Sequence, residues 1–295
     1  MSKKHPIIAT TGSSGAGTTT VRFAFEHIFF RESLTPVFVE GDSFHRFDRE
    51  GMRKAVSEAL ADDRDLSHFG PEGNMFEELE TCFSEYARSG TGARRYYNHT
   101  VEEALDRGGV SGEFTVWQPM PSGTDLMFYE GLHGGLVDGN VDVAQHVDLL
   151  IGVVPIVNLE WIQKIHRDTA ERGYDPTDVA ENILRRMPDY VHYITPQFSL
   201  TDVNFQRVPT VDTSNPFTAR DIPTLDESFV VIHFKNPDKL PIDFPYLLTM
   251  IQGSFMSRRN TIVVPGGKMG LAIEILFTPI IEELMRKRAQ AMRRV

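Results

Sequence analysis

Cysteine is almost absent from the chain, because Cys82 is the single one in 295 residues. This excludes a disulfide within the chain and a switch that pairs two of its own thiols. Long hydrophobic runs are absent as well. No apolar run reaches the ~18 residues of a membrane span, and no signal peptide is visible, so we expect a cytoplasmic protein with no membrane partner.

Basic charge is also scarce. Lysine and arginine number 30 against 41 acidic residues, which gives a formal net charge of −11. No basic stretch has the extent of a nucleic-acid footprint, so we expect no nucleic-acid partner. An acidic protein that handles phosphorylated ligands must concentrate its cations locally, and clustered Arg, Lys and His are therefore the residues to search for.

A glycine-rich stretch near the N-terminus matches a phosphate-binding loop except for a missing lysine. It follows an apolar run and precedes a helical pattern, so backbone N–H groups can converge on an anion at the start of a helix. The spacing of Gly12, Gly17 and Thr19 fits G-x-x-x-x-G-K-[ST], but Thr18 replaces the lysine. Another part of the chain must therefore supply a cation to the terminal phosphates. The alternative is a glycine-rich turn without a ligand. The residues expected to hold ATP are Gly12, Ser13, Ser14, Gly15, Ala16, Gly17, Thr18, Thr19 and Thr20, with the Thr19 hydroxyl on Mg²⁺.

Strand and helix patterns alternate along the chain, which predicts an α/β layered fold. Expected strands lie at 6–11, 36–40, 114–118, 125–130, 147–154, 208–212, 228–234 and 260–264. Expected helices lie at 19–32, 48–61, 75–88, 156–173, 176–187, 243–252 and 268–290. Several strands are continuous apolar runs, which is typical of strands covered on both faces in a mostly parallel sheet. We expect a P-loop NTPase-type fold, with a mixed sheet flanked by helices, in one domain over 1–295.

An aspartate follows the second expected strand. Ligands in open α/β sheets lie beyond the carboxyl ends of strands, so Asp42 should stand near the phosphate loop. A carboxylate there can accept the proton of a substrate hydroxyl while the γ-phosphoryl group leaves ATP; the alternative is a helix cap or turn residue. His45, Arg49 and Arg53 follow at a spacing of four. On one helical face they could clamp a substrate phosphate, or they could form a solvated basic face.

Glu130 closes the apolar strand at 125–130. A carboxylate at that strand end lies beside the hydroxyl of the phosphate loop and helps to hold Mg²⁺, directly or through water. The alternative is an acid that only caps the following turn. The sequence therefore predicts a magnesium site made from Thr19 and Glu130.

The helix expected at 156–173 carries a polar face opposite its apolar stripe. Lys164, Arg167, Asp168 and Arg172 share that face. Lys164 could replace the missing loop lysine, Arg167 could stabilise the transferring phosphoryl group, and Asp168 is a second candidate base or a metal-side acid. The alternative is a surface helix with ordinary ion pairs. With the next helix this segment forms an expected lid around 156–187.

Taken together, four segments resemble phosphoribulokinases of the proteobacterial kind, which are P-loop small-molecule kinases related to uridine kinase. These segments are 12–19, 41–46, 129–134 and 161–168. The resemblance covers nearly the whole chain. It implies the phosphorylation of D-ribulose 5-phosphate by ATP and Mg²⁺, which gives the 1,5-bisphosphate used in carbon fixation.

The resemblance also implies roles for individual residues and partners. Asp42 would be the general base, and Glu130 and Asp168 the magnesium-side or accessory acids. Lys164 and Arg167 would serve the lid and the γ-phosphoryl group, while His45, Arg49 and Arg172 would hold the sugar phosphate. Family members of this kind form homo-oligomers, often octamers, with NADH as an activator and AMP as an inhibitor.

Two other functions stay open at this stage. One is a kinase that acts on another phosphorylated sugar or a small hydroxyl substrate such as a nucleoside or pantothenate. The cluster of His45 and Arg49 favours an acceptor that already carries a phosphate. The other is a nucleotide-dependent regulatory switch, for which an aspartate beside a phosphate clamp has no evident use.

Overall fold

An eight-stranded mixed sheet forms the centre of the computed structural model, which describes residues 4–13, 17–170 and 173–293 and, of Thr19, the backbone alone. The strand order is β11-β12-β10-β9-β8-β1-β5-β2. The five strands from β9 to β2 are parallel to one another, and the other three pair antiparallel. The strands are β1 (Ile7–Thr11), β2 (Pro36–Glu40), β5 (Leu126–Gly131), β8 (Leu149–Val153), β9 (Val203–Pro209), β10 (Ser228–Phe234), β11 (Phe255–Arg258) and β12 (Thr261–Pro265).

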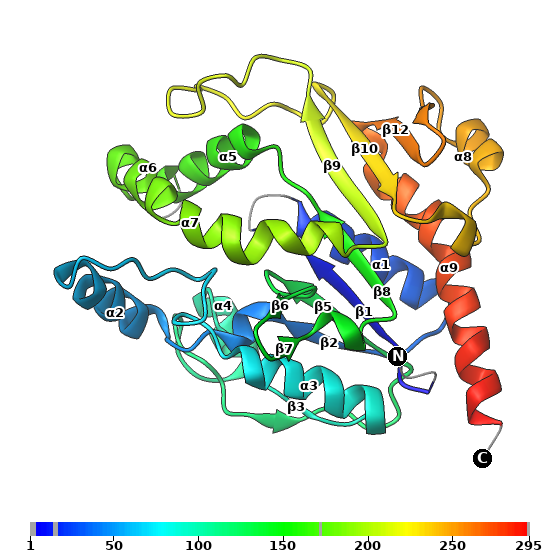
Figure 1. Cartoon of the computed structure of the whole chain (residues 1–295), viewed down its shortest axis with the longest axis horizontal. Coiled ribbons are helices and arrows are strands. Elements are labelled where there is room, and N and C mark those ends of the chain that lie inside the picture. Colours follow the sequence, from blue (N-terminus) through cyan, green and yellow to red (C-terminus); the bar gives the residue numbers. More distant parts are fainter. Residues whose placement is uncertain (1–3, 14–16, 171–172, 294–295) are drawn as a thin grey trace.

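Helices cover both faces of the sheet (Figure 1). They are α1 (Thr18–Arg31), α2 (Arg49–Ala61), α3 (Phe76–Ser89), α4 (Val101–Arg107), α5 (Val157–Ala170), α6 (Pro176–Arg185), α7 (Met187–Asp189), α8 (Phe244–Met250) and α9 (Met269–Met292). Two further pairs of short antiparallel strands lie outside the main sheet: β3 (Ala93–Arg94) with β4 (Gln118–Pro119), and β6 (Val137–Asp138) with β7 (Val141–Asp142). No described helix is long and apolar enough to cross a membrane.

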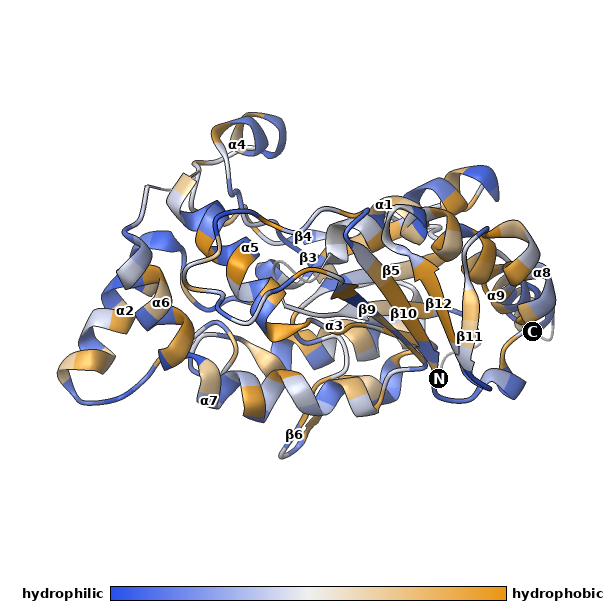
Figure 2. Ribbon diagram, turned by 90° about the horizontal axis from the view of Figure 1, so that it is seen from above, coloured by the Kyte–Doolittle hydropathy of each residue, from blue (hydrophilic) through white to orange (hydrophobic). Residues whose placement is uncertain are grey.

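Neighbouring residues of one strand serve two different cores. Ile8 of β1 packs with Phe25 of α1 and Phe277 of α9 on one face of the sheet. Ile7 and Ala9 point to the other face, where α3 covers them. Because side chains alternate along a strand, a fully apolar strand needs helices on both faces. Figure 2 shows the hydrophobic colour concentrated on strands such as β9, β10 and β12.

The expected α/β fold with a mostly parallel mixed sheet is confirmed, but some expected elements are wrong. The strand at 114–118 is absent, since Val116 and Trp117 lie exposed in the segment 95–117. This segment connects β3 to β4 and is called the excursion below. The strand at 208–212 is displaced, because β9 begins at Val203, where it pairs with Ile151 of β8. The sequence patterns missed α4, β11 and the helical turns that continue from α7 to Ser199.

Gln197 ties these helical turns to the sheet from a fully buried position. Its Oε1 accepts hydrogen bonds from the Thr11 hydroxyl at 2.8 Å and the Gly135 N–H at 2.9 Å. Its Nε2 donates to the carbonyl oxygens of Leu132 at 2.9 Å and Tyr193 at 2.7 Å. One side chain therefore joins the end of β1, the turn after β5 and the helical turns after α7.

Gln197→Ala should lower the free energy of unfolding by about 2–4 kcal/mol, because it leaves several buried donors and acceptors without partners. Urea unfolding followed by circular dichroism measures the change. Gln145→Ala is the matched control, since Gln145 is exposed and bonds Glu80 at the surface. An equal loss of unfolding free energy in both variants would contradict a stabilising role for the hydrogen bonds of Gln197.

Candidate functional site

The turn after β1 has the geometry of a phosphate loop. A Cβ at Gly12 would lie 2.7 Å from the Val153 carbonyl oxygen, and Gly17 has a φ of +104°. Both positions therefore require glycine. The helix α1 begins directly after Gly17, and no side chain caps its N-terminus. The free N–H groups and the positive end of the helix dipole suit an anion.

Parts of the predicted ATP site lie outside the described residues, namely Ser14, Gly15 and Ala16, together with the side chain of Thr19. Among the described ones, Ser13 is buried and Thr20 is exposed. Ser13 faces Glu160 of α5 and Tyr190. Burial raises the pKa of Glu160 to about 7, while the Ser13 hydroxyl and the charge of Lys164 oppose the rise. The first turn of α5 therefore lies against the phosphate loop.

Thr18, which replaces the loop lysine, lies close enough to Glu130 near the end of β5 for its hydroxyl to favour the ionised carboxylate. The guanidinium of Arg22 lies 3.7 Å from the same carboxylate. Burial raises the pKa of Glu130, and Thr18 and Arg22 oppose that effect. The register of β1 against β5 places Glu130 opposite Thr10, two residues before the loop begins at Gly12. The strand-end acid therefore lies at the phosphate loop, as the sequence predicts.

Asp42 lies in the single turn of 3-10 helix, Gly41–Phe44, that follows β2. Its Oδ1 lies 3.2 Å from His45 Nε2 and its Oδ2 lies 3.1 Å from His99 Nε2. Burial opposes the ionisation of Asp42, but the two imidazoles outweigh it and hold the pKa of the carboxyl well below its usual range. The side chain is still 39% exposed. An ionised carboxylate with an open face can accept the hydrogen bond of an incoming hydroxyl group.

The predicted arrangement of His45, Arg49 and Arg53 on one helical face is wrong. The Asp48 carboxylate accepts a hydrogen bond from Gly51 N at 2.7 Å, so α2 starts only at Arg49. His45 precedes the helix and is buried beside Asp42. Arg49 is exposed and donates to the His99 carbonyl oxygen at 2.8 Å, while Arg53 lies in solvent, 3.9 Å from Glu50. The structure brings His45 and Arg49 to the Asp42 site, but Arg53 does not reach it.

The polar face of α5 is an ion-pair cluster around Asp168. Lys164 Nζ pairs with Asp168 Oδ2, and Arg167 Nε lies 3.2 Å from Asp168 Oδ1. Asp168 is only 3% exposed, and the two cations balance the negative charge of this buried carboxylate. Burial lowers the pKa of Lys164, and Asp168 opposes that effect. Arg172 lies outside the described residues.

His68 shows that this cluster faces the Asp42 site. Its ring centroid lies 4.4 Å from that of His45. Burial, together with the positive charges of His45, Arg186 and Lys164, lowers the pKa of His68 well below its usual value. In Figures 1 and 2, α2, α5 and α6 lie together at the end of the molecule opposite α8 and α9. Lys164 of α5 and Arg186, which follows α6, therefore lie near the same histidine as Asp42 does.

Sequence patterns missed several residues of this site. His99 reaches Asp42 from the excursion between β3 and β4, and His68 and Asn74 contact His45 from the loop before α3. These segments have no helical or strand periodicity. The histidines in polar loops of the sequence could have drawn attention to His68 and His99. Their presence alone does not indicate which of them lie close together in the fold.

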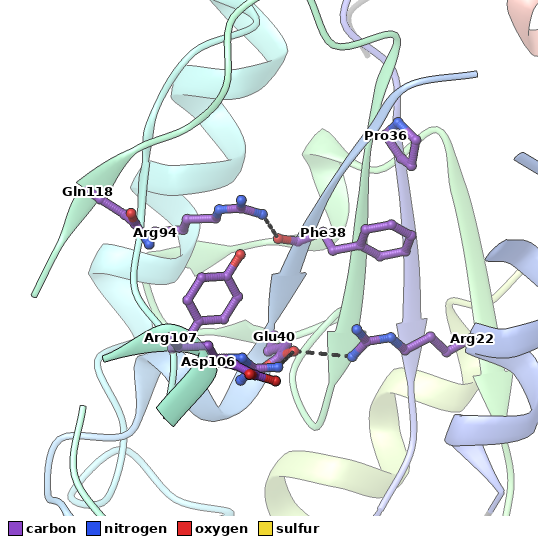
Figure 3. A pocket seen from close by; sticks show the side chains of 9 residues that line it. Arg22, Pro36, Phe38, Glu40, Arg94, Asp106, Arg107 and Gln118 are labelled. Atoms are coloured by element: carbon purple, nitrogen blue, oxygen red, sulfur yellow. Dashed lines mark hydrogen bonds and ion pairs between the residues drawn. The ribbon is translucent and has the colours of Figure 1, made fainter. Parts of the chain in front are cut away.

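A cavity of about 500 Å³ lies beside the edge strand β2 (Figure 3). Glu40 in its wall pairs with Arg22 at 3.2 Å and with Arg107 at 3.1 Å, and Arg107 stacks on the Tyr96 ring. Arg94 donates to the Phe38 carbonyl oxygen at 2.7 Å. Glu40 therefore joins Arg22 of α1 and Arg107 of α4 across the end of β2.

The described side chains include no cluster of three or more acids, histidines or cysteines able to hold a metal by themselves. Mg²⁺ in phosphoryl-transfer enzymes takes one or two carboxylates and completes its shell with phosphates and water. Glu130 beside the phosphate loop fits that requirement. The same loop, with its two obligatory glycines and an uncapped helix start, fits the phosphates of ATP.

Comparison with known proteins gives consistent matches. The model of the "Phosphoribulokinase / Uridine kinase family" matches residues 7–214. The chain is 60% identical over 292 residues to "Phosphoribulokinase, plasmid" from Cupriavidus necator, with 99% of each chain covered. It is 60% identical over 285 residues to "Probable phosphoribulokinase" from Escherichia coli, with 97% of this chain and 98% of that protein covered. The solved structure of the phosphoribulokinase from Rhodobacter spheroides has a TM-score of 0.90 at 53% identity, over 98% of this chain and 100% of that one.

Proposed function

Because the chain belongs to the phosphoribulokinase and uridine kinase family and is a kinase, we propose that it phosphorylates D-ribulose 5-phosphate at the 1-hydroxyl with ATP. The product is D-ribulose 1,5-bisphosphate, the compound that accepts carbon dioxide in the Calvin cycle. One observation carries the proposal. Asp42 lies at a strand end between two imidazoles, and 39% of its side chain is exposed.

Asp42 is the proposed general base. The carboxylate is ionised throughout the neutral range, because His45 and His99 hold its pKa low. It accepts the hydrogen bond of the acceptor hydroxyl and takes its proton as the new bond to phosphorus forms. Phosphoryl transfer proceeds through a loose transition state in most analyses, so positioning the hydroxyl matters more than a strongly basic group.

The phosphate loop is the proposed ATP site, with its backbone N–H groups on the phosphates. Glu130 and the Thr19 hydroxyl would hold Mg²⁺, which when bound neutralises charge on the phosphates. Lys164 takes the place of the loop lysine, and Arg167 joins it at the γ-phosphoryl group. Asp168, which pairs with both, sets their positions and is an accessory acid rather than the base.

The chain is proposed to form one kinase domain in which the segment 156–187 closes as a lid over both substrates. His45, Arg49 and Arg172 would hold the phosphate of the acceptor, whereas Arg53 is exposed and lies 3.9 Å from Glu50. A cytoplasmic location is part of the proposal, because ATP is available there. Assembly into homo-oligomers, octamers among them, and control by NADH and AMP are proposals that rest on family resemblance alone.

Product analysis by NMR tests the proposed reaction. Purified protein is incubated with Mg-ATP and D-ribulose 5-phosphate, and ³¹P spectra are recorded with proton coupling. We expect a second phosphomonoester signal coupled to the C1 methylene protons. A new phosphate on any other carbon would overturn the assignment of the 1-hydroxyl.

Arg49→Ala should raise the KM for ribulose 5-phosphate by roughly 10-fold or more and change kcat much less, because one charge-assisted contact to a phosphate is lost. Steady-state kinetics at saturating ATP measures both constants. Lys54→Ala is the control, since Lys54 is exposed on the same helix and faces Glu58. An unchanged KM in the Arg49 variant would remove this arginine from the clamp.

A further inference from the structure

Asn74 is a fully buried polar residue at the end of the loop 62–74. It pairs with His45 as an isolated antiparallel bridge. Its Oδ1 lies 2.8 Å from His45 Nδ1. Its Nδ2 donates to the carbonyl oxygens of His68 at 2.8 Å and Gly70 at 2.7 Å. Every hydrogen-bonding atom of this amide therefore has a defined partner.

These partners fix the orientation of the amide. The two carbonyl oxygens can only accept, so they must face the NH₂ group, whose two hydrogens they use. Oδ1 must then face His45, and an amide oxygen can only accept. The Nδ1 atom of His45 therefore carries a hydrogen.

The other ring nitrogen faces a carboxylate. His45 Nε2 lies 3.2 Å from Asp42 Oδ1. If His45 were neutral with its hydrogen on Nδ1, the Nε2 lone pair would point at the negative charge of Asp42. Two acceptors repel at that distance, whereas an imidazolium donates to both Asn74 and Asp42.

We infer that Asn74 is a positioning residue for phosphoryl transfer, which holds His45 as the charged hydrogen-bond donor to the base Asp42. The inference rests on the proposed role of Asp42. The arrangement gives one oxygen of the carboxylate a fixed donor in His45, while His99 Nε2 lies 3.1 Å from the other. Each oxygen of Asp42 keeps a further lone pair, which can accept a hydrogen bond from a substrate hydroxyl at the exposed side of this carboxylate.

Other charged or titratable groups also face His45. The His68 ring is tilted against that of His45, with 4.4 Å between the ring centroids. Arg95 donates to the His45 carbonyl oxygen at 2.8 Å, and the charge of His45 acts on the buried His133. Burial and Arg95 lower the pKa of His45, whereas Asp42 and Asn74 raise it, and the net direction is upward. The charged form therefore persists to higher pH than in a free histidine, and is lost as the pH rises through the raised value.

The direct test is a histidine titration by NMR with ¹³Cε1 and ¹⁵N labels, assigned with a His45→Gln spectrum. In the wild-type protein we expect both nitrogens of His45 to be protonated at neutral pH, with a pKa above that of a free histidine. Asn74→Leu removes the acceptor and should lower that pKa. It should also lower kcat/KM for ribulose 5-phosphate about 10-fold or more, the scale of one hydrogen bond to a charged group, and shift the alkaline limb of the pH profile to lower pH.

Two further variants separate positioning from folding. Asn74→Asp keeps an oxygen that accepts the hydrogen bond from His45 Nδ1, so the pKa of His45 should stay raised. It loses the two bonds that the NH₂ group donates to the loop, so the loop should be less stable. Ser67→Ala disturbs the same loop, because the Ser67 hydroxyl bonds Asp189 at 2.6 Å, but it leaves the partner of His45 in place. This variant should therefore leave the titration of His45 unchanged.

The inference is overturned if His45 of the wild-type protein titrates at or below the ordinary value, or carries no hydrogen on Nδ1 when neutral. It is also overturned if Asn74→Leu and Ser67→Ala give the same titration and the same pH profile. The titration needs no acceptor substrate. Failure of the proposed reaction would thus appear as absent turnover in the wild-type protein, separately from the state of His45.

Discussion

Asp42→Asn should lower kcat for ribulose 5-phosphate by about 10²-fold or more and leave ATP binding nearly unchanged. The magnitude is that of general-base catalysis. Asparagine keeps the shape of the side chain, but it can no longer take a proton, and it leaves His45 without the negative charge that it faces at 3.2 Å. The KM for ATP should hold because the phosphate loop lies at the end of β1, on a different strand.

The matched control for Asp42 is Asp65→Asn, since Asp65 is exposed in the loop before α3. It should have normal rates, which excludes a general effect of removing one negative charge. Initial rates of ADP formation and ATP binding by calorimetry are measured for both variants. A kcat within a few-fold of wild type in Asp42→Asn would remove Asp42 from the role of base, and Asp168 would then have to be tested.

Lys164→Met should lower kcat by about 10²–10³-fold, which is the usual cost of removing one group that stabilises charge in a transition state. Methionine retains most of the aliphatic length but supplies no charge to replace the missing loop lysine. The substitution also removes one of the two cations that pair with Asp168, a side chain that is only 3% exposed. Of these two, Arg167 stays in place. We therefore expect some loss of lid stability in addition to the loss of rate.

Lys54→Met controls for the loss of a lysine, because Lys54 is exposed and lies 3.8 Å from Glu58 on α2. Lys164→Arg is the informative second variant. It restores the charge but not the compact ammonium, so partial activity is expected. Single-turnover kinetics separates the chemical step from product release. Normal single-turnover rates in Lys164→Met would contradict the replacement of the loop lysine by Lys164.

Local patterns were sufficient for the strands that carry the site. The glycine spacing of the phosphate loop is a property of adjacent residues, and Asp42 and Glu130 could be placed because parallel strands end at one edge of a sheet. Lys164 and Asp168 pair on α5 as their spacing of four residues predicts. The roles of these residues remain predictions, because geometry alone does not establish them.

Partners from irregular segments could not be predicted in the same way. His99 and Asn74 meet the Asp42 site because two long loops fold back upon it, and no periodicity encodes such contacts. The error at His45 has a local cause. The cap at Asp48 starts α2 after this histidine, so spacing alone placed it on a helix that it does not join.

The most direct test of the proposed activity is ADP formation from Mg-ATP by the purified protein with different acceptors. D-ribulose 5-phosphate is compared with ribose 5-phosphate, uridine, pantothenate and no acceptor, each with and without NADH. We predict strong turnover with ribulose 5-phosphate alone. Strong turnover with another acceptor, or none that depends on an acceptor even with NADH present, would contradict the proposed function.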